Sequence, residues 1–192
     1  MFKLITAPSV EPVSVDELKA QLRITGTSQN TMLTNLEKAA RRIVEDYLRY
    51  SIISATWELY LDSFPKTGDC IWIQKSPVTD ITFIKYINSS GVLTEIIKDT
   101  DFIADYNAKP CRVYEAYGKG WPSPRAIRNA VVVKFISGYA TAAAVPDEIK
   151  QAILMLAATL YENPGDEVTG TQVNKIDKNS EWILKPLRAM RY

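Results

Sequence analysis

The sequence predicts an α+β protein in which helices at both ends of the chain flank an inserted stretch of antiparallel β-strands. Before residue 51 and after residue 145, apolar residues recur with the 3.6-residue period of helices. Between these limits, short runs of alternating apolar residues are separated by turn residues, which is typical of an antiparallel sheet or a small sandwich. We therefore expect a helical domain over 1–53 and 141–192, interrupted by a β domain over 54–140.

The composition is that of a globular protein, with no sign of a membrane partner or of secretion. A chain of 192 residues can bury one good core, or one core and a small second one. Its 23 basic and 22 acidic residues balance to +1, which argues against a protein whose main task is to bind nucleic-acid backbones. The longest apolar run, over 152–158, is far shorter than the ~20 residues that span a bilayer. Residues 1–12 lack the features of a signal peptide.

The first helix is predicted to begin at Ser14. This serine and Glu17 form the S-x-x-E pattern of a capping box, in which each side chain accepts a hydrogen bond from the backbone of the other residue. Leu18 and Leu22 provide an apolar stripe on the helix. Gly26 is expected to end it.

A second helix is predicted from Asn30, as its N-cap, to about Tyr50. Its apolar residues are three and four positions apart, so they form one continuous seam. Along a second line, charges of opposite sign alternate at i,i+4, which predicts a solvated ladder of ion pairs worth a few tenths of a kcal/mol each. The seam consists of Leu33, Leu36, Ala40, Ile43, Tyr47 and Tyr50, and the ladder of Glu37, Arg41, Glu45 and Arg49.

The period then changes from 3.6 to 2, which marks the start of the strands. Trp57, Leu59 and Leu61 share one face of the first predicted strand. The segment 88–91, Asn-Ser-Ser-Gly, predicts a hairpin turn between two later strands. The strands are expected at 56–62, 70–74, 79–87, 92–98, 102–106, 112–117 and 131–137.

A further helix is predicted after the strands, from Pro146 to about residue 162. Pro146 suits the first helical position, and two acidic residues follow it near the positive end of the helix dipole. Apolar residues cover both faces, so the helix needs cover from its own domain or from neighbouring subunits. One face carries Ile149, Ala152, Ile153, Leu156 and Leu160, and the other carries Leu154, Met155, Ala158 and Tyr161.

The C-terminal part of the chain combines a polar stretch with an apolar end. Residues 166–180 are rich in Asn, Asp, Thr and Lys and are expected to form a long loop. Residues 181–192 carry several large apolar side chains. A segment of this kind should dock, either on its own domain or on a partner protein, and the sequence leaves both open.

Candidate catalytic and metal-binding residues are scarce. The chain has no histidine, which removes the commonest general base and most zinc sites. Cys70 and Cys111 are expected to be buried free thiols. The segment 118–120, Gly-Lys-Gly, lacks the rest of a P-loop, and 99–110 lacks the glycine and the last glutamate of an EF-hand. We expect no enzyme activity, no cofactor and no metal.

The order of the segments resembles that of the head-to-tail connector (adaptor) proteins of tailed bacteriophages and prophages, in a longer form with a β insertion. Each segment also has a packing explanation, so the resemblance depends on their succession along nearly the whole chain. The segments that carry it are 12–24, 44–53, 56–65, 76–91, 118–123, 131–140 and 145–164.

The resemblance implies a structural protein of the virion neck, made in the cytoplasm of a bacterial host. It implies a ring of twelve copies that docks on the portal, extends the DNA channel and offers a platform for the next neck or tail protein. In the family the C-terminal segment commonly reaches the portal. The portal-binding candidates are therefore Trp182, Ile183, Leu184, Leu187 and Met190.

Two further sets of candidate residues follow from the expected ring. The subunit-interface candidates are Leu154, Met155, Tyr161, Tyr47 and Tyr50. Arg41 and Arg42 are candidates for weak, transient and non-specific contact with passing DNA. Two alternatives stay open: a tail-completion or tail-terminator protein of the same particle, and a small hydrolase that uses carboxylates on the β domain.

Overall fold

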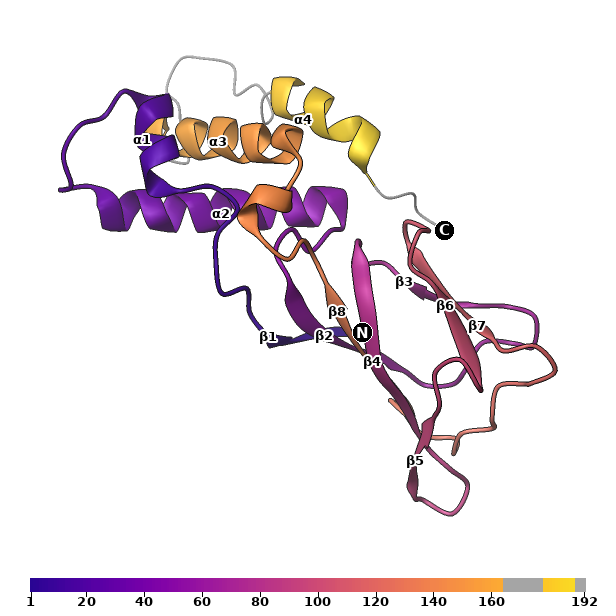
Figure 1. Cartoon of the computed structure of the whole chain (residues 1–192). Helices are drawn as coiled ribbons and strands as arrows, with labels where there is room; N and C mark the ends of the chain where they lie inside the picture. The colour runs from indigo at the N-terminus through magenta and orange to yellow at the C-terminus, as the bar shows by residue number, and fades with distance from the viewer. Residues whose placement is uncertain (164–177, 189–192) are drawn as a thin grey trace, which may run out of the picture. The chain divides into compact units, whose positions relative to one another are not determined.

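The computed structural model describes residues 1–163 and 178–188 (Figure 1). Within these residues the chain forms two compact units. The β unit comprises Met1–Ser9 and Ser54–Gly138, and the helical unit comprises Val10–Ile53 and the described part of Tyr139–Arg188. Helices and antiparallel sheets are both present, so the predicted α+β class is confirmed. The predicted domain boundaries stay a prediction, because a compact unit is not by itself an independently folding domain.

The β unit contains two antiparallel sheets. The larger sheet has the strand order β1-β2-β8-β4-β5, and the smaller has the order β3-β7-β6. The larger consists of β1 (Phe2–Thr6), β2 (Ala55–Leu61), β8 (Val131–Ser137), β4 (Val78–Ile87) and β5 (Leu93–Ile96). The smaller consists of β3 (Ile71–Ile73), β7 (Cys111–Glu115) and β6 (Phe102–Asp105). Every strand predicted from the period of two is present.

The strand β1 is an addition to the prediction. It pairs antiparallel with β2 at the edge of the larger sheet, with Phe2 opposite Leu59 and Leu4 opposite Trp57. The ring of Phe2 lies edge-on to Phe135 at 6.2 Å. The sequence showed no clear signal for β1 because an edge strand needs few buried side chains.

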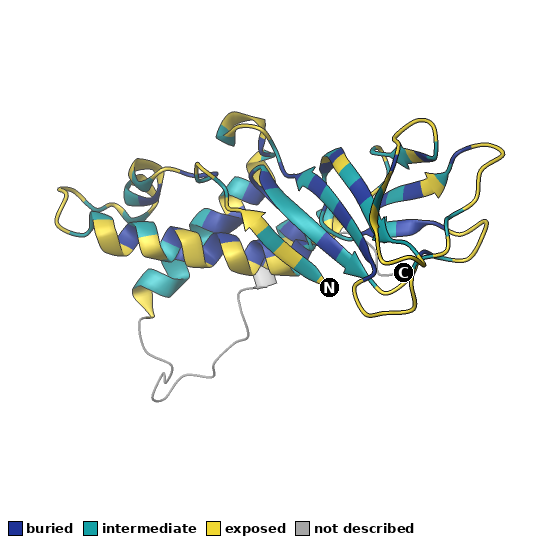
Figure 2. Cartoon of the chain, turned by 90° about the horizontal axis from the view of Figure 1, so that it is seen from below, coloured by how far each residue is buried: buried dark blue, intermediate teal, exposed yellow. Residues whose placement is uncertain are grey.

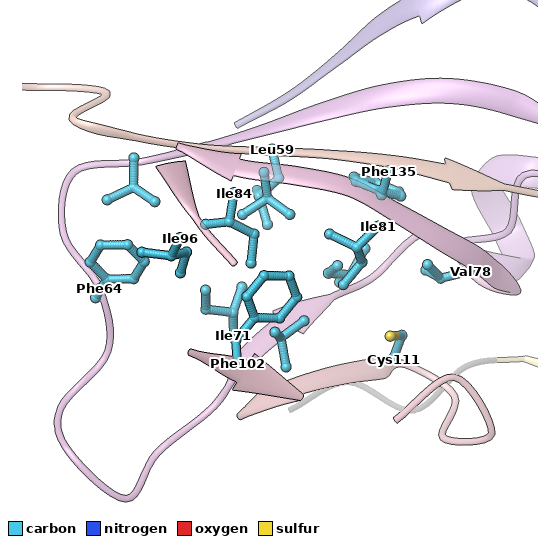
Figure 3. Close-up of a cluster of buried hydrophobic side chains, with 14 residues drawn as sticks. Leu59, Phe64, Ile71, Val78, Ile81, Ile84, Ile96, Phe102, Cys111 and Phe135 are labelled. Carbon is cyan, nitrogen blue, oxygen red and sulfur yellow. The ribbon is translucent and has the colours of Figure 1, made fainter. Parts of the chain in front are cut away.

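The core of the β unit lies between its two sheets. Figure 3 shows Ile84 and Phe135 pointing from the larger sheet towards Phe102 and Cys111 of the smaller one. Buried and half-buried residues alternate strictly along β8, as the period of two requires, and the bands on the strands in Figure 2 show the same alternation. The turn at 88–91 is confirmed, since the backbone N–H of Asn88 donates to the carbonyl of Val92 at 2.9 Å.

The helical unit consists of helices that pack against one another. The long helices α2 (Asn30–Leu48) and α3 (Asp147–Glu162) lie side by side (Figure 1). The core is formed by one face of each, with Leu33 and Val44 of α2 and Ile149 and Ile153 of α3 almost fully buried. The other elements are α1 (Val15–Leu22), η1 (Ala142–Ala144), α4 (Lys178–Leu184) and η2 (Lys185–Leu187).

The helix ends agree with the predictions in part. The capping box of α1 is confirmed: the Ser14 hydroxyl accepts from the Glu17 N–H, and the Glu17 carboxylate accepts from the Ser14 N–H. Gly26 does not end this helix. Arg23 does, with a left-handed φ of 57°.

At the other two helices the predicted caps are one residue out of place. The N-cap of α2 is Gln29 instead of Asn30, and Pro146 occupies the N-cap position of α3 instead of its first helical position. Residues 166–177 of the predicted loop lie outside the described residues, and 178–180 belong to α4 instead. None of the described helices is long and apolar enough to cross a bilayer.

Candidate assembly interface

Four of the five portal-binding candidates lie on α4 and η2, and the structure separates these four by exposure. Leu184 is only 3% exposed and lines a small hollow together with Val44, Tyr47 and Leu156. Ile183 and Leu187 are half-buried, whereas Trp182 is 79% exposed. Met190 lies outside the described residues. The helix is therefore anchored to its own unit by one apolar side chain and presents a large aromatic one to the outside.

The subunit-interface candidates also divide into two groups. Leu154, Met155 and Tyr161 of α3 and Tyr47 of α2 are half-buried, so part of each side chain remains accessible. The Tyr161 hydroxyl donates to Gln29 Oε1 at 2.8 Å, which fixes that ring within the unit. The fifth candidate, Tyr50, forms the second group: it is only 3% exposed and belongs to the core of the helical unit.

The candidates for contact with DNA have different environments. Arg42 is exposed. Arg41 is 8% exposed and makes two ion pairs, one from Nε to the Glu11 carboxylate at 2.6 Å and one from Nη1 to the Glu45 carboxylate at 3.0 Å. Of the two, only Arg42 offers its guanidinium to a partner in this conformation.

The ion pairs of Arg41 correct the predicted solvated ladder. The i,i+4 pair between Arg41 and Glu45 is present, but both residues are buried, and so is Glu37. The remaining oxygen of Glu45 accepts a hydrogen bond from the Ile52 N–H at 3.0 Å. The prediction that these charged residues share one line of the helix is correct, but the prediction that water surrounds them is wrong. The sequence period cannot show that the segment carrying Glu11 covers this line.

Glu37 is the most unusual titratable residue of the helical unit. It is 2% exposed, and its Oε1 has no hydrogen-bond partner in the structure. Burial, followed by the nearby charge of Glu11, raises the pKa of this carboxyl from 4.5 to about 7. Nothing in the sequence predicts this raised pKa, because Glu37 does not differ in its sequence context from other glutamates on helices.

The described residues offer little for catalysis. No group of three or more His, Cys, Asp or Glu residues in 1–163 and 178–188 could hold a metal ion. Cys70 and Cys111 are buried free thiols, as predicted. Burial raises the pKa of Cys111 to about 12, which keeps it a neutral thiol and a poor nucleophile.

Several apolar side chains of the β unit are exposed, and the sequence analysis did not single them out. On the hairpin of β4 and β5, Val92 and Leu93 are 58% and 59% exposed, and Ile97 just after β5 is 61% exposed. On the smaller sheet Ile103 is 48% exposed and lies opposite Tyr114. The alternating pattern predicted these strands but could not show which of their apolar side chains lack cover.

Three solved structures share this fold. A chain from the neck of an empty gene transfer agent (GTA) particle, computed with C6 symmetry, matches with a TM-score of 0.81 and 23% identity. A chain from the virion of a native GTA particle matches with a TM-score of 0.80 and 23% identity. A chain from the neck of a native GTA particle, computed with C12 symmetry, gives 0.77 and 21%. Each match covers 100% of this chain and 97% of the other.

Comparison with curated proteins gave no match. At the level of sequence families, residues 12–106 match the phage gp6-like head-tail connector proteins. This stretch begins at the α1 capping segment, includes α2 and continues through β6. It therefore contains most of the segments on which the predicted resemblance depends. The resemblance is confirmed: the chain belongs to the phage gp6-like head-tail connector protein family.

Proposed function

We propose that this protein forms a twelve-membered ring in the neck of a tailed phage, a prophage-encoded particle or a related particle. There it docks on the portal, extends the DNA channel and offers a platform for the next neck or tail protein. Its family supports a connector role. The shared fold with a chain from a GTA neck computed with C12 symmetry supports the ring. The family is one of structural connector proteins, so the chain is not an enzyme.

A ring of identical subunits uses heterologous contacts, in which two different surfaces of each copy meet. We assign one of these surfaces to the partly accessible apolar side chains of α3, Leu154 and Met155, together with Tyr161. Exposed apolar residues on α2, Met32 at 45% and Ile43 at 37%, are suited to the opposing surface. Tyr47 adds to the α2 side. Burial of these side chains by a neighbour would stabilise the ring through the hydrophobic effect.

The observation that carries the portal assignment is the exposure of Trp182. Leu184 holds α4 on the helical unit, so the tryptophan is displayed on an ordered helix and little conformational entropy is lost when it binds. Tryptophan is among the residues that most often dominate the energy of protein interfaces. We therefore place Trp182 at the centre of the portal contact, with Ile183 and Leu187 beside it.

Contact with passing DNA is assigned to Arg42 alone of the two arginines, because Arg41 is occupied by two carboxylates. An exposed arginine would bind phosphate weakly and in a salt-dependent way. Weak contact suits a channel through which DNA must move.

The test is to mix the protein with its portal and to measure complex formation by negative-stain imaging and by mass. We expect rings stacked on the portal. Trp182→Ala should weaken binding by at least about tenfold, because it removes the main apolar anchor. Glu181→Ala, at an exposed neighbour on the same helix, should bind as the wild type does.

Equal binding by the Trp182 and Glu181 variants would remove the portal assignment of α4. A protein that ignores the portal and binds the tail tube instead would indicate a tail-completion protein.

A further inference from the structure

The buried charges of α2 are connected to the places where the chain passes between the two units. Within residues 1–163 the chain passes between them after Ser9, after Ile53 and after Gly138. On the helical side, each passage is therefore next to a short segment of that unit. These crossing segments are 10–13, 50–53 and 139–141.

All three crossing segments are joined to α2 by one chain of polar contacts. Arg41 binds Glu11 of the first segment at 2.6 Å and Glu45 of its own helix at 3.0 Å. Glu45 accepts from the Ile52 N–H of the second segment at 3.0 Å. The Ile52 carbonyl in turn accepts from the Tyr139 N–H of the third segment at 2.9 Å.

The charged side chains that make these contacts are largely shielded from water. The side chains of Arg41, Glu45 and Glu11 are 10%, 7% and 21% exposed. Ile52 is fully buried. A buried charge that loses its partner is strongly destabilising. Loss of Arg41 would leave the carboxylates of Glu11 and Glu45 without their partner, so that each would have to become hydrated or protonated.

Glu37 lies one helical turn before Arg41 and is the unpaired acid of this environment. The charged groups that act on it are Glu11 from the first crossing segment, Glu17 from α1, and Arg41 and Lys38 from its own helix. From α3, Lys150 acts on Glu17. While Glu37 is neutral, one guanidinium serves two carboxylates. Once it ionises, three buried or partly buried carboxylates compete for the same guanidinium.

We propose that Glu11, Arg41 and Glu45 form a clamp that holds the three crossing segments on α2, and that the clamp loosens when Glu37 loses its proton. The clamp is a conformational device within the helical unit. It is independent of the proposed portal contact, and it acts on the segments through which the β unit is attached.

The clamp is tested by amide hydrogen exchange on the full-length protein. In Arg41→Met, the amides of Ile52 and Tyr139 should exchange about tenfold faster or more, because the contacts that hold their segments are lost. The amide of Ala157, in the middle of α3, should keep its rate. Arg42→Met is the matched control, since it removes an exposed arginine next in sequence, and it should exchange as the wild type does.

If Arg41→Met does not fold, Glu11→Gln gives the same test with less disturbance, because it keeps the shape of the side chain and removes one charge. Unchanged exchange at Ile52 and Tyr139 in a folded Arg41→Met or Glu11→Gln protein would overturn the clamp.

The role of Glu37 is tested by the pH dependence of the same two amides, after correction for the intrinsic exchange rate. In the wild type, protection should fall by about tenfold as the pH rises from about 6 to about 8, through the pKa of Glu37. In Glu37→Gln, protection should stay constant over this range. The same fall in both proteins would remove Glu37 from the mechanism and leave only a static clamp.

Discussion

The two units of this protein differ in the kinds of side chain that they bury. In the β unit the large buried side chains are apolar, and the polar residues that are buried among its described residues are serines, Ser76 and Ser137. In the helical unit, α2 buries Glu37, Arg41 and Glu45 as well as its apolar face. An apolar core tolerates changes of pH, whereas a core with ionisable groups couples stability to protonation. The comparison predicts that the β unit is governed by packing and the helical unit also by charge.

The largest effect is expected from a cavity in the β unit. Phe135 of β8 is fully buried between the sheets. Phe135→Ala should lower the free energy of unfolding by about 3–5 kcal/mol, because the lost burial leaves a cavity that the sheets cannot close. Val132→Ala, on the same strand but half-buried, is the control and should cost much less. Urea unfolding measures both, and equal losses would contradict a core dominated by packing.

The second effect concerns the charge of the helical unit. The pKa of Glu37 is about 7 in the folded chain, whereas the ordinary value, which applies to the unfolded chain, is 4.5. Between pH 4.5 and about 7 the folded chain therefore keeps a proton on Glu37 that the unfolded chain has lost. Stability should therefore fall as the pH rises from about 4.5 to about 7, by up to about 3 kcal/mol. Glu37→Gln should remove this fall, so that the variant is more stable than the wild type at pH 8 and similar at low pH.

Thermal unfolding at several pH values measures this difference. Glu148→Gln, at an exposed position of α3, is the control and should follow the wild type. A Glu37→Gln protein that loses stability with pH as the wild type does would show that other groups set the pH dependence.

A smaller effect is expected where the helical unit uses exposed polar contacts. Ser14→Ala breaks the capping box of α1 and should cost about 1 kcal/mol, because it leaves a backbone N–H at the helix start without its partner. Ser28→Ala, an exposed serine just before α2, should be close to neutral. The helicity and the urea midpoint report the result.

The smallest effect is expected from an exposed ion pair of the β unit. Lys85 and Glu95 face each other across β4 and β5 at 3.2 Å, with side chains 31% and 51% exposed. Glu95→Gln should cost less than about 0.5 kcal/mol, since water screens the pair. A cost comparable to that of breaking the Arg41 pairs would show that burial is not what separates the two units.

Patterns of local sequence predicted most of the fold. The alternation in β8 and the turn at 88–91 correspond to observed elements almost residue for residue. The cap at Ser14 was predictable because its chemistry lies within four residues. β1 was missed because its partner β2 is far along the chain and its own side chains carry little burial.

The candidate interface was predictable only in its residue types. The sequence identified Trp182 and Leu184 as apolar, but which of them anchors α4 and which is exposed depends on the hollow formed with α2 and α3. In the same way, the line of charges on α2 was visible, but its burial depends on Glu11, which lies far from Arg41 in the sequence. Whether a side chain is buried depends on how the whole unit packs, and the local period of the sequence does not show it.

Glu37 has a consequence for the electrostatics of the whole chain. Histidine is the side chain that normally changes charge near neutral pH, and this chain has none. A buried carboxyl takes over that range. When Glu37 holds its proton, 23 basic side chains face 21 ionised acidic ones, so the formal net charge is +2 instead of +1. A chain without histidine thus still has a group whose charge changes on mild acidification, and that group is buried in the helical unit.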